Sequence, residues 1–232
     1  MSTLVTYPAM KGQFSLSPFC VKAAFLLNAA GRKWQREDTN DPRAMPYQKL
    51  PVLKAEGGLI PDSDNIRSHL EENGARFDVG LTDAQKAHSR ALIRMAEEHL
   101  YFHVVLDRWG SETVWPTIRD TYFRDIPRIL RIPITGRLRK HLLSGLRTQG
   151  IGRLTSAERL ERLEPDLAAI SALLWQSDYL FGSHPTAADF SVAAVLGAMR
   201  ATPVETDMVR RIKRDPVLSP YIDRLGQPEE PE

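Results

Sequence analysis

The first third of the chain alternates short β-rich segments with helical ones. Thr3–Tyr7 is rich in β-branched residues, which favours a strand. Pro18–Ala30 is apolar on most faces, begins with proline and stops before Gly31, features typical of a buried helix. The same signals predict strands over 33–38, 50–55 and 59–60, an irregular segment or short helix over 41–48, and a helix over 64–73. This order, β-α-β-(α)-β-β-α, indicates a small α/β sheet with helices.

From Thr82 onward the pattern is helical. Thr82 and Gln85 have the spacing of a capping box, and the helix that they open runs to about Trp109 with apolar residues over much of its surface. Further helices are expected over 112–130 and 134–146, interrupted by Pro116, Pro127, Pro133 and Gly136, and over 156–175, 190–199, 204–214 and 220–225. We therefore expect an α+β protein with an α/β domain over 1–74, a polar linker over 75–81, an all-α helical-bundle domain over 82–226 and a frayed tail over 227–232.

The composition excludes several classes of protein. The 232 residues are 42% hydrophobic and 26% charged, which is ordinary for a folded protein. A net charge of +2 and the lack of a basic tail argue against a nucleic-acid partner. Because Cys20 is the only cysteine, an intramolecular disulfide and a cysteine-based zinc site are excluded, and we expect no metal. No signal peptide or bilayer-spanning run is evident, which predicts a cytoplasmic protein.

Candidate chemistry begins at Ser17-Pro18-Phe19-Cys20, at the start of the first predicted helix. A helix N-terminus carries partial positive charge and unpaired N–H groups, so it favours an anion such as a thiolate. The tetrapeptide has the form of a redox Cys-x-x-Cys pair in which serine replaces the first cysteine. Proline near a helix start is also common for structural reasons alone.

Two later stretches can complete a ligand site. The proline of Leu50-Pro51-Val52 begins a strand, and in the cis form it would turn the preceding backbone outward to pair with an extended peptide. A trans proline that starts an edge strand is the alternative. Asp62-Ser63, at a helix start, can hold a ligand carboxylate and amine, or can simply cap the helix.

These three stretches, in this order and before a helical domain, resemble the glutathione S-transferases. That family has a thioredoxin-like N-terminal domain and an all-α C-terminal domain, and the resemblance covers nearly the whole chain. Ser17 matches the serine or cysteine that addresses the glutathione sulfur, and Leu50 matches the residue that pairs with the cysteinyl backbone of glutathione. Asp62-Ser63 matches a Glu/Gln-Ser pair that holds the γ-glutamyl end, with aspartate as a shortened glutamate.

The second half of the chain strengthens this resemblance. Pro185-Thr-Ala-Ala-Asp189 resembles the buried capping box of the family, a structural motif in which Thr186 and Asp189 cap each other. Segments within 81–101, 107–109 and 150–153 resemble the branch related to failed axon connections and metaxin proteins, whose bacterial members are usually called glutathione S-transferase-like proteins.

The resemblance implies glutathione as a co-substrate and no metal. The implied glutathione-binding residues are Lys49, Leu50, Pro51, Val52, Asp62 and Ser63. A hydrogen bond from Ser17 Oγ, together with the first helix N-terminus, would favour the thiolate, which then attacks an unknown electrophile. Tyr7 and Cys20 rank after Ser17 for this role, and Cys20 is expected to face the core.

Other functions remain open at this point. The alternative is a non-catalytic binding or adaptor protein of the same fold, as the metaxin resemblance allows. A thiol oxidoreductase is disfavoured because Ser17 occupies the position of the attacking cysteine. The family is usually dimeric, so we expect a homodimer.

The helical half contains two further candidate features. His99 and His103, one turn apart, and Arg108 are candidates for lining a second-substrate pocket, although such histidines are commonly structural. The segment 119–153 carries nine Lys or Arg and two Asp, a net charge of +7. It can meet an anionic membrane surface, an anionic substrate or an acidic partner, or it can be a solvated face.

Overall fold

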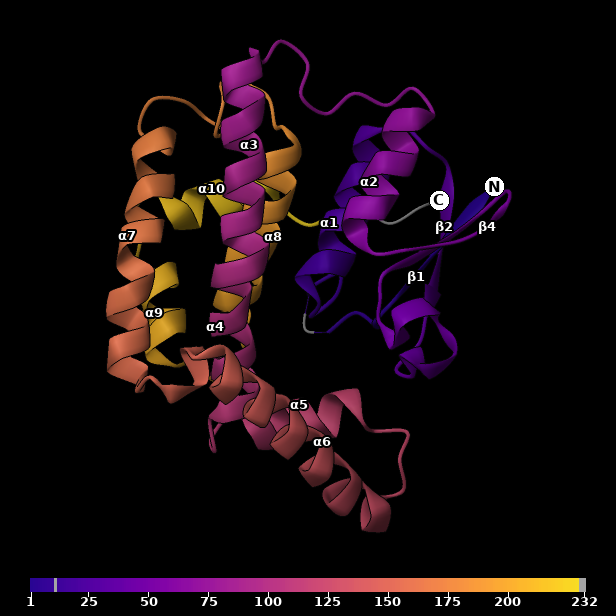
Figure 1. Ribbon diagram of the computed structural model, residues 1–232, viewed down its shortest axis with the longest axis vertical. Helices are drawn as coiled ribbons and strands as arrows, with labels where there is room; N and C mark the ends of the chain where they lie inside the picture. Colours follow the sequence, from indigo (N-terminus) through magenta and orange to yellow (C-terminus); the bar gives the residue numbers. More distant parts are fainter. Residues whose placement is uncertain (11, 230–232) are drawn as a thin grey trace.

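The computed structural model describes residues 1–10 and 12–229 and places an α/β domain beside a helical domain (Figure 1). The α/β domain contains a four-stranded mixed sheet in the order β2-β1-β3-β4. Strand β1 (Ser2–Thr6) pairs parallel with β2 (Trp34–Asp38) and antiparallel with β3 (Val52–Ala55), which pairs antiparallel with β4 (Gly58–Pro61). The thioredoxin-like domain followed by a helical domain confirms the predicted fold class.

Helices α1 (Pro18–Ala29) and α2 (Ser63–Glu72) lie between the sheet and the helical domain (Figure 1). Helix α1 packs against both the sheet and α8 (Ala187–Arg200), where the rings of Phe25 and Phe190 stack with centroids 5.9 Å apart. A helix covered on two sides needs apolar residues on most of its faces. This explains the sequence pattern of α1, whose residues from Cys20 to Leu27 are all buried.

A continuous helical rod from Asp83 to Gly110 forms the centre of the helical domain. Its parts are α3 (Asp83–Met95), a π-helical segment η3 (Ala96–Leu100), α4 (Tyr101–Val105) and a second π-helical segment η4 (Leu106–Gly110). The predicted capping box opens it: Gln85 N donates to Thr82 Oγ1 at 3.3 Å, and Thr82 N donates to Gln85 Oε1 at 2.9 Å. The other helices are α7 (Ser156–Leu174), α9 (Asp207–Lys213) and α10 (Leu218–Leu225), and 3₁₀ turns occur at Pro42–Ala44 (η1), Pro46–Gln48 (η2) and Ile151–Arg153 (η5).

The segment between the rod and α7 differs from the prediction. It forms α5 (Trp115–Tyr122) and a long α6 (Arg128–Gln149), so Pro133 and Gly136 lie inside a helix that they were expected to interrupt. Pro133 is near the helix start, where the carbonyl that loses its donor belongs to Ile129, an exposed residue that water can reach. Within 1–10 and 12–229, neither α6 nor any other helix has the length and apolar character needed to cross a bilayer.

The linker and the tail both connect the two domains. In the linker, Phe77 is buried, and the Asp78 carboxylate accepts hydrogen bonds from Arg67 Nη2 at 2.8 Å and from Ala187 N at 3.1 Å. After α10, Gln227 Oε1 accepts from the backbone N–H of Phe14 at 2.8 Å. Of the tail that was expected to fray, residues 230–232 lie outside the described residues.

Candidate functional site

Three stretches that are distant in sequence meet at one edge of the α/β domain. Because β1 pairs with β3 at Val5 and Val52, the residues before β3 lie near the start of α1, and Leu50 packs with Cys20. Because β3 pairs with β4 at Val52 and Pro61, the end of β4 returns to the same edge. The backbone N–H of Asp62 donates to the carbonyl of Pro51 at 3.1 Å, which joins the second stretch to the third.

Ser17 is the N-cap residue of α1, and its backbone is extended (φ −87°, ψ 117°). Its carbonyl accepts from the N–H groups of Cys20 and Val21, but its side chain makes no capping hydrogen bond. Ser17 is half-buried, and its own N–H donates to Ser15 Oγ at 3.3 Å. The hydroxyl of Ser17 therefore stands at a helix N-terminus without the capping role that such a residue normally has.

The two other sulfur-addressing candidates are poorly suited to ionise. Cys20 is completely buried, and burial raises the pKa of its thiol, although hydrogen bonds from Thr6 and Ser17 act in the opposite direction. Burial also raises the pKa of the Tyr7 phenol well above its ordinary value, and the Cys20 side chain adds to this effect. Both groups stay protonated at neutral pH, so Tyr7 can donate a hydrogen bond but is not a thiolate or phenolate nucleophile.

The Leu50–Pro51 peptide bond is cis, the first of the two geometries considered for this stretch. Leu50 is 7% exposed and Val52 is fully buried at the start of β3, while Lys49 is exposed with an extended backbone.

Asp62 and Ser63 open α2. Asp62 Oδ1 accepts from the N–H of Asp64 at 2.8 Å, so the helix-capping role is present. The backbone of Asp62 has φ +75°, a conformation that is costly for a residue other than glycine and that clusters at functional sites. Ser63, the first helical residue, is 2% exposed.

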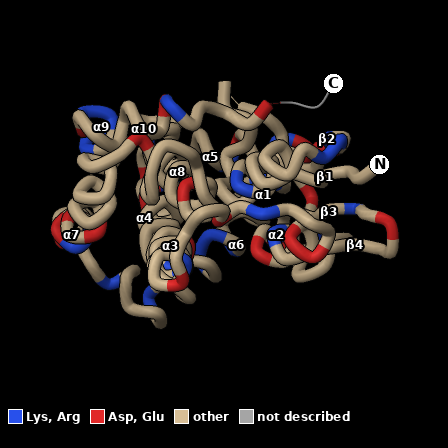
Figure 2. The backbone as a smooth tube through the Cα atoms, turned by 90° about the horizontal axis from the view of Figure 1, so that it is seen from above, with Lys and Arg blue, Asp and Glu red and all other residues tan. Residues whose placement is uncertain are grey.

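A set of charged side chains that the sequence analysis did not single out lies behind α1 and α2. We call it the interdomain ion network; its members are Lys22, Asp64, Arg90, Arg94 and Glu97. Figure 2 shows charged positions of both signs on α1, α2 and α3, where the two domains meet. The network fixes the helices whose N-termini carry Ser17 and Ser63 against the helical domain.

The geometry of the network depends on two carboxylates. Lys22 Nζ lies 2.8 Å from Asp64 Oδ1 and 2.6 Å from Glu97 Oε1, and Glu97 also accepts from Ser191 Oγ. Burial by itself would raise the pKa of Asp64, but the surrounding cations, with Lys22 foremost, hold it well below its usual range. A lysine within an apolar helix was the one sequence signal that could have indicated this network.

Arg108 is a buried tie between the domains and lines a small cavity of about 20 Å³. It is 4% exposed, and its guanidinium donates to the carbonyls of Leu16 and Ala198, both at 2.6 Å, and to Thr202 Oγ1 at 3.2 Å. The bond to Leu16 holds the residue that precedes Ser17.

Aromatic side chains of the helical domain reach the same end of α1. The rings of Tyr7 and Tyr122 meet edge to face with centroids 5.6 Å apart, and those of Phe19 and Tyr101 at 4.7 Å. Burial raises the pKa of both Tyr101 and Tyr122. The sequence analysis did not single out these two tyrosines, whose rings contact Tyr7 and Phe19 beside the candidate site.

His99 and His103 belong to a different part of the molecule. His99 Nδ1 contacts Asp166 Oδ2 on α7, and His103 lines a cavity of about 580 Å³ together with Asp107, Arg147 and Arg159. None of the predicted glutathione-binding residues lines this cavity. Among residues 1–10 and 12–229, no group of three His, Cys, Asp or Glu side chains is arranged to hold a metal ion.

The predicted capping box at the start of α8 is present in the buried core. Asp189 Oδ2 accepts from the N–H and the hydroxyl of Thr186, both at 2.8 Å. Asp189 Oδ1 accepts from Leu180 N at 3.0 Å and from Tyr221 OH at 2.9 Å. Because all of its contacts are internal, this pair is structural.

Comparison with known proteins identifies relatives of both domains. A family model described as the glutathione S-transferase N-terminal domain matches residues 18–114, and one described as the glutathione S-transferase C-terminal domain matches residues 155–224. The isoprene-epoxide–glutathione S-transferase of Rhodococcus sp. (strain AD45) is 25% identical over 234 residues, which cover 97% of this chain and 98% of that protein. Failed axon connections of Drosophila melanogaster is 30% identical over 200 residues, 80% of this chain and 47% of that protein, so the chain spans about half of its length.

Solved structures agree with these matches at the level of the fold. A glutathione S-transferase of Ceriporiopsis subvermispora, in complex with glutathione, has a TM-score of 0.63 at 14% identity, with 97% of this chain and 94% of that chain covered. The first family model covers most of the α/β domain and the helical rod, and the second covers α7 to α10 in the same chain order. The chain therefore belongs to the glutathione S-transferase family.

Proposed function

We propose that this protein binds glutathione at the edge formed by Ser17, Leu50–Val52 and Asp62–Ser63, and transfers its thiolate to a small electrophile. One observation carries the proposal. The hydroxyl of Ser17, which does not cap α1, lies at the same edge as a cis-proline turn that is hydrogen-bonded to the start of α2, and Cys20 and Leu50 join the two stretches in one hydrophobic cluster. The glutathione complex of the Ceriporiopsis relative supports glutathione as the ligand of this fold.

The chemistry follows from the position of Ser17. A free thiol with a pKa near 8.5 is only about 3% thiolate at pH 7. A hydrogen bond from Ser17 Oγ and the partial positive charge at the N-terminus of α1 stabilise the thiolate more than the thiol. A shift of one to two pKa units requires roughly 1.4 to 2.8 kcal/mol, which one such donor and a helix dipole can supply. The sulfur then forms a bond to the electrophilic carbon while the bond from that carbon to its leaving group or ring oxygen breaks. The departing group leaves as an anion or takes up a proton from solvent.

The remaining residues bind and orient the tripeptide. The backbone at Leu50 would pair with the cysteinyl part, Lys49 lies beside it on the surface, and the start of α2 at Asp62–Ser63 would hold the γ-glutamyl end. Tyr7 and Tyr101 keep their protons and would present phenol groups toward the electrophile. The proposal places the protein in the cytoplasm as a homodimer.

The decisive experiment is Ser17→Ala, with Cys20→Ser and Tyr7→Phe as matched variants. We expect Ser17→Ala to lower the conjugation rate by up to about 8- to 25-fold at pH 7, because a rise of the thiol pKa from about 7.5 or 6.5 to about 8.5 reduces the thiolate fraction from roughly 24% or 76% to about 3%. The pKa of bound glutathione, followed by thiolate absorbance, should rise toward 8.5 while glutathione affinity changes little. If Ser17→Ala keeps the wild-type rate across pH 6 to 9, Ser17 is not the activating group.

A non-catalytic binding or adaptor function is the second candidate. It is supported by the similarity to failed axon connections and by Arg108, whose buried guanidinium is occupied by internal acceptors. Isothermal titration with glutathione separates the two functions, because an adaptor without a glutathione site gives no heat of binding. If glutathione binds, a panel of electrophiles should begin with small epoxides, the substrate class in the name of the Rhodococcus relative.

A further inference from the structure

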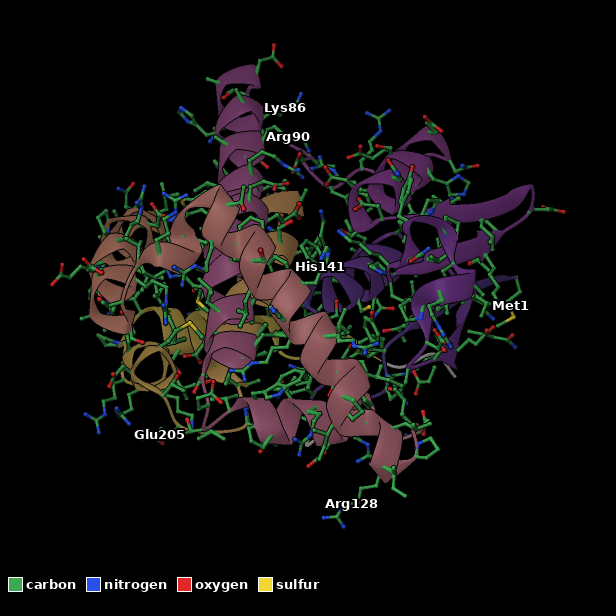
Figure 3. The ribbon with its side chains drawn as sticks, turned by 60° about the horizontal axis from the view of Figure 1, so that its bottom comes forward. Met1, Lys86, Arg90, Arg128, His141 and Glu205 are labelled. Carbon is green, nitrogen blue, oxygen red and sulfur yellow. The ribbon has the colours of Figure 1, made fainter. Side chains whose placement is uncertain are left out.

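Helices α5 and α6 lie in a segment, 115–154, that neither family model matches. Figure 1 shows them at the lower end of the molecule, beyond the bodies of the two domains. Figure 3 shows α6 from another side, with Arg128 at the extremity of the molecule and its side chain directed outward. A separate function for this segment would leave the glutathione S-transferase fold unchanged.

The first half of α6 exposes a concentrated group of aliphatic side chains. We call it the α6 tip; its members are Ile129 (89% exposed), Leu130 (52%), Ile132 (61%), Ile134 (46%) and Leu138 (41%). Half of the large hydrophobic residues that are exposed in the described part of the chain lie within residues 129–138. Single exposed aliphatics are ordinary, whereas a contiguous group marks an interaction surface.

The exposure of the α6 tip is not the result of a loosely attached helix. The opposite face of α6 is held by Thr135, which is 1% exposed, and by Leu146 in the core. Arg139 donates to the carbonyl of Trp109 at 2.6 Å and forms an ion pair with Glu112 at 2.8 Å. The helix is thus anchored along one face, and the tip residues surround the other sides.

The cations of α6 fall into two groups. Arg131 and Arg139 are partly buried and hydrogen-bonded to the body of the protein. Arg128, Arg137, Lys140 and Arg147 are exposed, and within residues 1–10 and 12–229 none of them has an ion-pair or side-chain hydrogen-bond partner. An acidic surface would complement this face.

We propose that the α6 tip and these four cations dock the protein on an anionic lipid bilayer. With a rise of 1.5 Å per residue, Leu130 and Arg137 are about 10 Å apart along α6, so the aliphatic tip and the cations that follow it can reach the same surface. The aliphatic tip enters the acyl boundary while Arg137 and Lys140 meet the phosphates, which Arg binds in a bidentate manner.

Flotation of the whole protein with vesicles tests this proposal. We expect binding to mixed phosphatidylcholine–phosphatidylglycerol vesicles, little binding to phosphatidylcholine alone, and weaker binding as salt is raised. Each cation near an anionic surface strengthens binding roughly fivefold, so Arg137→Gln/Lys140→Gln/Arg147→Gln should weaken it roughly 100-fold. Ile129→Gln/Leu130→Gln/Ile132→Gln should weaken it at least about tenfold, because the apolar insertion is lost.

Matched controls separate docking from loss of charge or of folding. Lys33→Gln/Arg76→Gln/Arg214→Gln removes three exposed cations far from α6 in the sequence and should bind as the wild type does. Circular dichroism and thermal unfolding verify that every variant is folded. Inorganic phosphate at the same total phosphate concentration should not displace the protein from vesicles, which distinguishes a headgroup surface from a free-phosphate site.

Several results would overturn the proposal. One is equal binding to neutral and anionic vesicles, or no binding to either. Another is that the control triple variant loses as much binding as the α6 variants. If the glutamine variants of the α6 tip instead convert a dimer to a monomer, or abolish binding to an acidic protein with vesicle binding unchanged, the surface serves a protein contact and the bilayer assignment is wrong.

Discussion

The interdomain ion network can be tested by removing its buried cation. Lys22 is 1% exposed and bridges Asp64 and Glu97, which belong to different domains. Methionine has a similar length and an apolar character, so Lys22→Met keeps most of the packing of α1 and deletes only the charge and its hydrogen bonds. Glu97, which is 6% exposed, then retains Arg94 and Ser191 as partners.

The expected loss of stability follows from this geometry. Removing one partner of a buried ion pair costs about 3–5 kcal/mol. Because Glu97 keeps two partners, we expect the lower end of that range, about 3 kcal/mol, in the free energy of unfolding from urea titration. For a chain of this size the melting temperature should fall by about 6–12 °C.

Lys54→Met is the matched control, since Lys54 forms an exposed ion pair with Glu37 and should change stability by less than about 1 kcal/mol. The double variant Lys22→Met/Glu97→Leu measures the coupling. The loss caused by Glu97→Leu should be at least about 1 kcal/mol smaller once Lys22 is gone. Equal effects of Lys22→Met and Lys54→Met, or strict additivity in the double variant, would refute the reasoning.

Further variants and titrations probe other parts of the structure. Arg108→Met removes the buried donor to the Leu16 carbonyl, so the free energy of unfolding should fall by about 3 kcal/mol and the conjugation rate should decrease. An unchanged melting temperature would show that Arg108 does not hold the two domains together. Burial lowers the pKa of His103 to about 4 from the ordinary 6.5, so the unfolded chain binds a proton at a higher pH than the folded protein does. The free energy of unfolding should therefore fall as the pH decreases from 6.5 to 4. NMR titration of His103 checks this, and a midpoint near 6.5 would disprove it. Thr186→Ala should lower the free energy of unfolding by about 1 kcal/mol, and Asp189→Ala should lower it by about 3 kcal/mol because several buried donors lose their acceptor. Equal losses for the two variants in denaturant titrations would argue against the capping geometry.

Local signals in the sequence were sufficient for most of the elements. The strand at β1, the helix that begins at Pro18 and the capping box at Thr82 were predicted because each depends on residues close together in the sequence, while the capping box at Thr186 was expected from the family resemblance. The prediction failed at Pro133, where local chemistry favours a helix break. Contacts of α6 with the rod, from Arg139 to Trp109, keep the helix continuous despite the proline.

The sequence by itself marked Ser17, Leu50–Pro51 and Asp62–Ser63 as candidate ligand-binding stretches and predicted the order of the two domains. It could do so because motif spacing and hydrophobic periodicity are properties of the chain. Only the tertiary structure decided the cis form of Pro51 and the separation of His103 from Arg108, whereas the burial of Cys20 was already expected from the sequence. It also decided which cations are paired and which face solvent, because pairing depends on partners many residues away. Ion pairs and exposed faces are properties of packing, which hydrophobic periodicity alone does not specify.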